Sequence, residues 1–358
     1  MARLGDYVRI RTGKLDANAS SENGQYPFFT CAVEPLRIDS YSYDCECVLV
    51  AGNGDLNVKY YNGKFDAYQR TYIIESLDKT VLAVPYLYRF LDKYVETLRQ
   101  QAIGGVIKYI KLGNLTEAEI PIPTVEEQSE IVIKLNKVNE LIALRKEQLA
   151  KLDQLVKSRF IELFGGTTDA EKVTMADICK IITDGTHQPP KFVSEGIPFL
   201  FVSNIVTNEI HYDAQKFISG ETYAELIKRT PIAIGDILLS TVGSYGHPAV
   251  VKTEKPFCFQ RHIAYLKPNA DIVDSEYLRG AILSADVQRQ IDEGVKGIAQ
   301  KTLNLSEIRK IKLPLPPIEQ QKQFAAFVEQ TDKSKLAIQQ SLDKLETLKK
   351  SLMQEYFG

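Results

Sequence analysis

The sequence predicts an α+β protein with two mixed α/β domains, each followed by a long helix, and with the two helices paired as an antiparallel coiled coil. Three observations predict this fold and its pseudo-two-fold internal repeat. One segment of the chain occurs twice, both copies have the apolar spacing of a long helix, and the regions before them are rich in strand and turn signals. With 358 residues the chain is long enough for two or three domains.

The composition is that of a globular protein. Apolar residues make up 44% of the chain and charged residues 25%, which excludes a mainly disordered or collagen-like protein. No apolar run is long enough to span a membrane, and the first residues lack the apolar core of a secretory signal. We therefore expect a soluble, cytoplasmic protein.

Charge and cysteine content limit the possible functions. The chain has 44 basic and 46 acidic residues, whereas a protein that binds DNA unaided is usually basic, because phosphate contacts supply much of the affinity. The five cysteines include no C-x-x-C pair, so we expect reduced thiols and no zinc site. The four histidines also lack the spacing of metal ligands.

The repeated segment covers residues 120–165 and 313–358. The two copies align without a gap at an offset of 193, with 13 identities in 46 positions. Each copy begins with a proline-containing strand and then lacks Pro and Gly until its last residue. Since proline does not fit a helix interior, each helix must begin after Pro123 or near Pro317.

The repeated helices have a heptad pattern. Thr124 and Glu127 predict a capping box at the start of the first helix. Leu, Val and Ile then recur with the spacing of a coiled-coil seam from Leu135 to Leu163. The second copy carries polar residues on this seam, namely Thr331, Lys335 and Lys349. Each helix should be about 38 residues, or about 57 Å, long.

The domain organisation follows from the repeat. We expect a domain at 1–120, a helix at 121–165, a second domain at 166–313 and a second helix at 314–358. Strand-like runs in the two domains lie at 47–51, 71–75, 237–241, 249–252 and 262–266, and helical runs lie at 86–101 and 275–291.

The two domains share sequence landmarks. The segment 4–13 parallels 175–185, and Gln69-Arg70 parallels Gln260-Arg261. A third set precedes the proline strands: Lys111, Asn114 and Leu115 parallel Lys301, Asn304 and Leu305. Between the landmarks the domains diverge, which indicates one scaffold used twice with different surfaces.

Motifs of catalysis are missing. QPPKF at 188–192 lacks the first Asn or Asp of a methyltransferase NPPY motif, and GNGD at 52–55 does not enter a helix as a nucleotide-binding turn does. There is no P-loop and no G-x-S-x-G nucleophile turn. The sequence therefore predicts no active site.

The order of several strings along the chain resembles a known family. These strings are IPIPTVEEQ at 120–128, LPLPPIEQQ at 313–321, GDILLSTVGSYG at 235–246, FDAYQRTYII at 65–74 and AQKTLNLSEI at 299–308. Over essentially its whole length the chain resembles the specificity (HsdS) subunit of Type I restriction–modification systems. Its final Phe357-Gly358 matches Phe164-Gly165, so we expect a complete subunit with two halves.

The resemblance implies sequence-specific DNA binding without catalysis. Each domain would be a target-recognition domain that reads one half of a bipartite, asymmetric DNA site. The helices would set the spacer between the half-sites and dock methyltransferase subunits. Two methyltransferase and two restriction/translocase subunits would bind the chain, and adenosylmethionine, ATP and Mg²⁺ would belong to these partners, leaving this chain with no cofactor.

Candidate DNA-binding residues lie in polar, turn-like segments, including the acid-free stretches 56–65 and 237–253. Basic, amide and hydroxyl side chains suit phosphate contacts and base-edge hydrogen bonds, although a solvated loop of a neutral domain has the same composition. The candidates are Thr12, Lys14, Asn57, Lys59, Lys64, Thr186, His187, Lys191, Ser203, Asn204, Ser244, Tyr245 and His247.

Two other functions stay open. A coiled-coil scaffold with twin protein-binding domains fits the helices equally well. A stand-alone DNA methyltransferase would require an adenosylmethionine site, whose motifs the sequence lacks.

Overall fold

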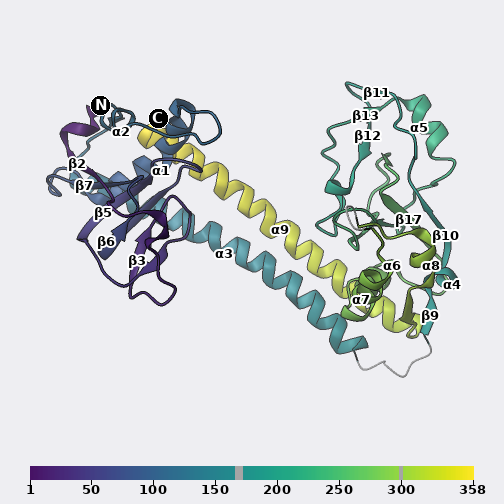
Figure 1. Ribbon diagram of the computed structural model, residues 1–358. Helices are drawn as coiled ribbons and strands as arrows, with labels where there is room; N and C mark the ends of the chain where they lie inside the picture. Colours follow the sequence, from purple (N-terminus) through teal and green to yellow (C-terminus); the bar gives the residue numbers. More distant parts are fainter. Residues whose placement is uncertain (166–171, 298–300) are drawn as a thin grey trace. The chain divides into compact units, whose positions relative to one another are not determined.

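The computed structural model describes residues 1–165, 172–297 and 301–358 of the chain. These residues form two compact units (Figure 1): the first consists of Met1–Glu147 and Gln339–Gly358, and the second of Gln148–Ile338. Both units contain part of the long helices α3 (Val125–Phe164) and α9 (Ile318–Phe357), each of 40 residues. The expected start of the second domain at residue 166 lies outside the described residues.

The first unit is built on a six-stranded sheet with the order β2-β7-β5-β6-β3-β4. All its pairs are antiparallel except β3 with β6. The strands are β2 (Val8–Thr12), β7 (Thr71–Ser76), β5 (Tyr43–Ala51), β6 (Val58–Ala67), β3 (Tyr26–Phe29) and β4 (Leu36–Ile38).

Both faces of this sheet are apolar. Helix α1 (Val84–Gln101) packs Leu87 and Leu91 against Val48 and Val50 of β5. The alternate β5 residues, such as Leu49, belong to a second cluster with Phe29, Phe65 and Ile73. This follows from the strand geometry, because successive side chains point to opposite faces.

The second unit has two four-stranded sheets. The first has the order β10-β17-β14-β15 and is antiparallel, and the second has the order β11-β13-β12-β16 with β12 and β16 parallel. The strands are β10 (Cys179–Asp184), β17 (Ile263–Pro268), β14 (Ile237–Ser240), β15 (Pro248–Val250), β11 (Phe192–Val193), β13 (Phe217–Ile218), β12 (Ile197–Leu200) and β16 (Cys258–Phe259).

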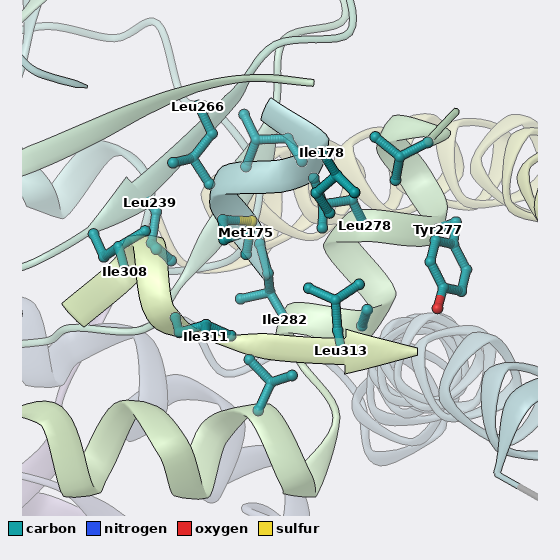
Figure 2. Close-up of a cluster of buried hydrophobic side chains, with 14 of the residues drawn as sticks. Met175, Ile178, Leu239, Leu266, Tyr277, Leu278, Ile282, Ile308, Ile311 and Leu313 are labelled. Atoms are coloured by element: carbon teal, nitrogen blue, oxygen red, sulfur yellow. The ribbon is translucent and has the colours of Figure 1, made fainter. Parts of the chain in front are cut away.

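Short helices cover one face of the antiparallel sheet. They are α4 (Met175–Ile178), α6 (Ser275–Ile282), α7 (Ala285–Gly294) and α8 (Leu305–Lys310). Figure 2 shows Met175 and Ile178 of α4 in one cluster with Leu239 and Leu266 of the sheet and Ile308 of α8. Helix α5 (Gly220–Leu226) lies outside this cluster.

Short strands link each domain to the segment before its long helix. Strand β1 (Ala2–Arg3) pairs with β8 (Glu119–Ile120), and β9 (Lys172–Thr174) pairs with β18 (Lys312–Pro314). The short helix α2 (Leu112–Thr116) precedes β8 as α8 precedes β18.

Most expected elements are present, and one helix is interrupted. The five strand-like runs lie in β5, β7, β14, β15 and β17, and the helix expected at 86–101 is α1. The helix expected at 275–291 is wrong, since the structure has two helices that break at Leu283-Ser284. The Ser284 hydroxyl accepts a hydrogen bond from the Val287 N–H (3.4 Å) and so caps α7.

The long helices pair antiparallel within each unit. In the first unit Lys146 contacts Glu346 (3.2 Å), and in the second unit Asp153 forms an ion pair with Lys335. The predicted capping box is confirmed, since the Glu127 N–H donates to Thr124 Oγ1 (3.3 Å) and the Thr124 N–H donates to the Glu127 carboxylate (2.9 Å).

The polar seam residues of the second helix are accommodated without a break. Thr331 is buried, and its hydroxyl donates to the Phe327 carbonyl (2.9 Å). The Lys335 side chain is only 17% exposed, because its stem packs on the seam while its ammonium group reaches Asp153.

A buried glutamine fixes the start of each long helix. Gln128 accepts a hydrogen bond from the Ala83 N–H (2.9 Å) and donates to the carbonyls of Val81 (2.8 Å) and Pro123 (2.9 Å). Gln321, its counterpart in the repeat, makes the same three bonds, and its partners are Asp274, Ile272 and Pro316. This identity in the repeat is therefore structural.

A tyrosine packs against the last phenylalanine of each long helix. The Tyr86 hydroxyl donates to the Pro121 carbonyl (3.0 Å), and the Tyr86 ring lies 5.2 Å from the ring of Phe357. In the second unit, Tyr277 donates to the Pro314 carbonyl (2.5 Å) and lies 4.9 Å from the ring of Phe164. The C-terminal phenylalanine of each repeat thus packs on the helix that follows a sheet, α1 in the first unit and α6 in the second.

Candidate nucleic-acid interface

Several loops meet at one end of the first sheet. Thr12 at the end of β2 pairs with Tyr72, and Thr71 at the start of β7 pairs with Ala51 at the end of β5. The β5–β6 turn begins at the same level, because Val50 pairs with Val58. We call this end, made by residues 12–16, 52–57 and 68–71, the first loop end.

The second unit has the equivalent arrangement. Asp184 at the end of β10 pairs with Ala264, and Ile263 at the start of β17 pairs with Ser240 at the end of β14. The next turn connects β14 to β15. We call residues 184–187, 240–247 and 260–263 the second loop end.

Backbone hydrogen bonds identify the equivalent residues. The Gly13 N–H donates to the Thr71 carbonyl (3.1 Å) as the Gly185 N–H donates to the Ile263 carbonyl (3.2 Å). Gln69 and Arg261 occupy the same position, since their N–H groups donate to Leu15 and Thr186. Hence the expected match of Gln69-Arg70 with Gln260-Arg261 is wrong by one residue, and the counterpart of Arg70 is His262.

Two equivalent glycines permit this arrangement. A Cβ atom on Gly185 would lie within 3.0 Å of the carbonyl oxygens of Phe259 and Gln260. On Gly13 it would meet those of Ala67 and Tyr68 in the same way. Only glycine allows the two backbone segments to approach so closely.

A hairpin from later in the chain completes each loop end. Ile103 and Tyr109 exchange two backbone hydrogen bonds, as do Lys296 and Thr302. The Gly54 N–H then donates to the Lys108 carbonyl (2.9 Å), and the Gly243 N–H donates to the Lys301 carbonyl (3.2 Å).

These bonds correct the third landmark. Lys301 corresponds to Lys108, not to Lys111, so the expected match was wrong by three residues. The counterpart of Lys111 is Asn304, since these residues precede the first residues of α2 and α8. The offset of 193 that relates the long helices therefore extends back to this hairpin.

Most of the predicted DNA-binding residues lie at or beside the two loop ends. Those at or beside the first loop end are Thr12, Lys14, Asn57 and Lys59, and those at the second are Thr186, His187, Ser244, Tyr245 and His247. A neighbouring loop carries Ser203 and Asn204, and it approaches the second loop end where Asn208 Oδ1 lies 3.2 Å from His247 Nδ1.

Two candidates lie elsewhere. Lys64 pairs with Asp44 within the β5–β6 ladder, and its ammonium group lies 4.7 Å from the ring centroid of Tyr41. Lys191 is exposed and directly precedes β11. Neither residue is linked by a described hydrogen bond to a loop end.

Some candidate side chains already form hydrogen bonds within the domain. The Asn57 amide donates to the carbonyls of Cys31 (2.8 Å) and Asp55 (2.9 Å), while its oxygen accepts from Lys59. Burial lowers the pKa of Lys59 below its usual value. Asn57 and Lys59 thus form part of the loop framework.

Further candidates in the second unit are also held by internal contacts. Asn204 accepts from the Phe201 N–H (2.9 Å) and donates to the His211 carbonyl (3.0 Å). The His187 ring lies 2.9 Å from the Asp184 carboxylate, and the Tyr245 hydroxyl donates to Asp292 (3.0 Å). The Thr186 hydroxyl donates to the Gln188 carbonyl (2.9 Å).

Other candidates present open polar groups. Within the part of the chain that the structure describes, no side-chain hydrogen bond or ion pair engages Thr12, Lys14, Lys191, Ser203 or Ser244. Ser203 and Ser244 are exposed hydroxyl groups, which can donate and accept at a base edge. These side chains are the ones free to contact DNA without breaking an internal bond.

The predicted DNA-binding residues leave out three exposed cations at or beside the loop ends, of which the sequence analysis named Arg70 and Lys301 only as landmarks of the repeated scaffold. Arg70, Lys108 and Lys301 form no ion pair among the described residues. Had the 193-residue offset been extended upstream of Ile120, it would have aligned Lys108 with Lys301.

Within 1–165, 172–297 and 301–358, no group of three His, Cys, Asp or Glu side chains could hold a metal ion. No helix in the described part of the chain has both the length and the apolarity required to cross a membrane.

One known protein family matches two separate parts of the chain. The model of the Type I restriction modification DNA specificity domain matches residues 1–154 and 168–349. Each match contains one of the two loop ends.

Curated relatives carry the same description. The Escherichia coli EcoDI specificity subunit is 39% identical over 154 residues, a match that covers 43% of this chain and 34% of the relative. The E. coli EcoBI specificity subunit is 23% identical over 307 residues, covering 76% of this chain and 64% of the relative. The chain thus matches about a third of the first relative and just under two thirds of the second. The MjaVIII specificity subunit of Methanocaldococcus jannaschii is 20% identical over 387 aligned residues, a match that covers 99% of this chain and 90% of the relative.

Solved structures have the same fold. The S subunit of a Type I restriction–modification system from M. genitalium superposes with a TM-score of 0.64 at 17% identity, covering 100% of this chain and 95% of the other. A chain from a study of Type I R-M complex assembly and conformational transition superposes with a TM-score of 0.57 at 17% identity. The superposition covers 99% of this chain and 96% of the other. The predicted α+β fold with long paired helices is confirmed.

Proposed function

The chain belongs to the family of Type I restriction modification DNA specificity domains, and we propose that each of its two domains reads one half of a bipartite, asymmetric DNA site. It acts as the non-catalytic specificity subunit of a restriction–modification complex. The recognition domains are residues 1–120 and 166–313, and the helical segments 121–165 and 314–358 set the spacer between the half-sites.

One observation carries this proposal: the two loop ends have the same backbone and different side chains. The equivalent hydrogen bonds of Gly13 and Gly185 hold both frameworks in one conformation. On this constant framework Arg70 is replaced by His262, and Asn53 by Val242. A constant framework with variable side chains is what reading two different half-sites requires.

Partner subunits explain the lack of net positive charge. With a formal charge of −2, this chain supplies few phosphate contacts. Two methyltransferase subunits that close around the duplex supply the rest and bring adenosylmethionine for adenine methylation. Two restriction/translocase subunits bring ATP and Mg²⁺. The complex acts on DNA in the cytoplasm.

The outer face of α3 is suited to docking a methyltransferase subunit. Ile133 and Leu144, both in the first unit, are exposed and lie eleven residues apart. Eleven residues make about three helical turns, so the two side chains lie along one face. An exposed apolar stripe on a paired helix indicates a protein partner.

We expect methylation mapping to reveal one two-part motif. Single-molecule sequencing of genomic DNA from the host strain should show methyladenine at a motif with a fixed spacer, and deletion of this gene should remove it. A methylation pattern that does not change on deletion, with the gene and its partners expressed, would contradict the proposed function. It would favour the scaffold alternative.

Replacing Ser244 with alanine should weaken only one half of the site. A lost base-edge contact costs about 1–3 kcal/mol at one position, and Ser244 lies at the second loop end. The assembled complex should lose discrimination among duplexes altered in the second half-site and keep it for the first. Lys14→Ala provides the mirror control in the first domain. Equal loss for both half-sites after Ser244→Ala would contradict a base-reading role.

A further inference from the structure

We infer that Lys108 and Lys301 hold the DNA backbone as sequence-independent phosphate contacts, one in each half. The inference rests on the proposed function and names residues outside the candidate set. It starts from the observation that each lysine directly precedes a residue, Tyr109 or Thr302, that exchanges two backbone hydrogen bonds with Ile103 or Lys296.

The hairpin is built into each framework by conserved geometry. Gly104 and Gly297 occupy the same position and both have a positive φ, of 119° and 106°. The Gly54 and Gly243 N–H groups bind the carbonyls of Lys108 and Lys301, and both glycines also have positive φ values, of 70° and 71°. Positive-φ glycines at two matching positions, four glycines in all, show that the backbone path is the same in both halves.

The following residues anchor each hairpin to the sheet. The Ile110 N–H donates to the Gly52 carbonyl (2.9 Å), and the Leu303 N–H donates to the Thr241 carbonyl (2.8 Å). Both Ile110 and Leu303 are buried. Each lysine therefore projects from a fixed base, two residues before a core side chain.

The charge around each lysine selects a negatively charged partner. Residues 97–116 contain three basic residues and no acidic residue, and residues 294–306 contain two basic residues and no acidic residue. Lys296 lies 3.9 Å from Glu307, whereas Lys108 and Lys301 have no ion pair among the described residues. Two free cations at matching positions suit phosphate groups.

The first hairpin also exposes apolar side chains at its tip. Val106 is 102% exposed and Ile107 is 61% exposed. Such residues can pack on sugars and thymine methyl groups when the neighbouring lysine binds a phosphate.

Duplex DNA accounts for these observations better than a protein partner does. A phosphate contact fixes the position of the protein but carries no sequence information. The same contact can therefore serve both halves, while the neighbouring residues of the loop ends differ. The hairpin is also hydrogen-bonded to the turn that carries the candidate side chains Asn57 in the first unit and Ser244 in the second.

The test measures DNA affinity of the full chain assembled with its methyltransferase partner. Wild type, Lys108→Ala, Lys301→Ala and Lys108→Arg are titrated against a labelled duplex with the mapped site and against an unrelated duplex, from 50 to 200 mM salt. Each alanine variant should lose affinity for both duplexes by the same factor. The loss should shrink by about 3-fold across this salt range, because one phosphate contact contributes about 0.9 to the log–log slope. Lys108→Arg should retain wild-type binding.

Lys255→Ala is the matched control, an exposed lysine that follows β15 at the opposite end of the sheet from the second loop end, and it should leave affinity and salt slope unchanged. Unchanged affinity and slope in both alanine variants would overturn the inference, as would a loss confined to one duplex, which marks base reading. A failure of Lys108→Ala to assemble with the methyltransferase, with normal DNA binding once assembled, would identify a protein contact and also overturn it. The wild-type complex must bind the duplex with the mapped site more tightly than the unrelated duplex for these outcomes to apply. A wild-type complex that binds both duplexes equally would instead overturn the proposed function.

Discussion

Replacing Gly185 with alanine should unfold the second loop end and abolish methylation of the bipartite site. The added Cβ would lie within 3.0 Å of two backbone carbonyl oxygens, from Phe259 and Gln260. Backbone atoms cannot move aside as a flexible side chain can, so β10 must separate from the start of β17. We expect a cost of about 3 kcal/mol or more, the range of severe strain or overpacking.

Hydrogen exchange can locate this effect. In Gly185→Ala the amides of β10 and β17 should lose protection, while those of β2 and β7 in the first unit keep it. The mirror variant Gly13→Ala should have the opposite pattern, because a Cβ there meets the carbonyl oxygens of Ala67 and Tyr68. Loss of either half removes the whole bipartite site, so methylation should fail in both variants.

Gly220→Ala provides the matched control in the second unit. Gly220 is the first residue of α5, its φ is not in the left-handed region, and a Cβ there would have no atom within 4 Å. Alanine should therefore be neutral or slightly stabilising, since it lowers the entropy of the unfolded chain. Normal protection of β10 in Gly185→Ala would show that the loop end can relax around a side chain, contrary to our expectation.

The long helices could be predicted because their signals are local. The prolines, the capping box at Thr124 and the heptad spacing all act within a few turns, and the structure has helices at Val125–Phe164 and Ile318–Phe357. The break at Ser284 was missed because a serine inside an amphipathic pattern can be either an exposed helix residue or an N-cap. Packing of α6 and α7 decides between these, and it is not visible in the local sequence.

The equivalence of the domains was predicted, but its register was not. Matching by residue type paired Gln69 with Gln260 and Lys111 with Lys301. In the structure, equivalence is set by backbone N–H and carbonyl groups, which every residue other than proline carries. The same position is therefore held by Gln69 and Arg261, whose side chains have little in common.

The candidate site was only partly predictable, because it too is assembled from segments that are distant in sequence. Composition marked the acid-free stretch 56–65, but most of it is the single strand β6. Lys59 and Lys64 lie five residues apart on that strand, so their side chains point to opposite faces. Lys108 lies far away in sequence from Asn57 and joins its turn through the bond from the Gly54 N–H to the Lys108 carbonyl, a contact that no local pattern indicates.

Replacing Tyr277 with alanine should produce the largest loss of stability in the second unit. Four aromatic rings meet where α3 ends and α9 begins: Tyr277 of α6 lies 5.8 Å from Phe160 and 4.9 Å from Phe164, and Phe160 lies 5.4 Å from Phe324. Gly280 has no room for a Cβ, which would approach Phe160 within 3.0 Å. Removing a fully buried aromatic side chain from such a packed cluster costs about 3–5 kcal/mol.

The tyrosine hydroxyl makes a separable contribution. Burial raises the pKa of Tyr277, so the hydroxyl stays protonated and donates to the Pro314 carbonyl (2.5 Å). Tyr277→Phe keeps the ring and removes only this bond, at a cost of about 1 kcal/mol. The difference between the two variants therefore measures the contribution of the ring.

Urea unfolding of the full chain, followed by hydrogen exchange in each unit, measures both variants. Tyr277→Ala should lower the stability of the second unit by several times as much as Tyr277→Phe and leave the first unit unchanged. Equal losses in the two variants would assign the stability to the hydroxyl bond and would contradict the packing argument. Phe164 at the end of α3 packs on Tyr277 and also lies 5.8 Å from the ring of Phe324 in α9. The alanine variant should therefore also free the end of α3 and the first turns of α9 together. Coupled loss of protection in these two segments, with the amides around Phe357 and Tyr86 still protected, is the pattern that one aromatic anchor per unit requires.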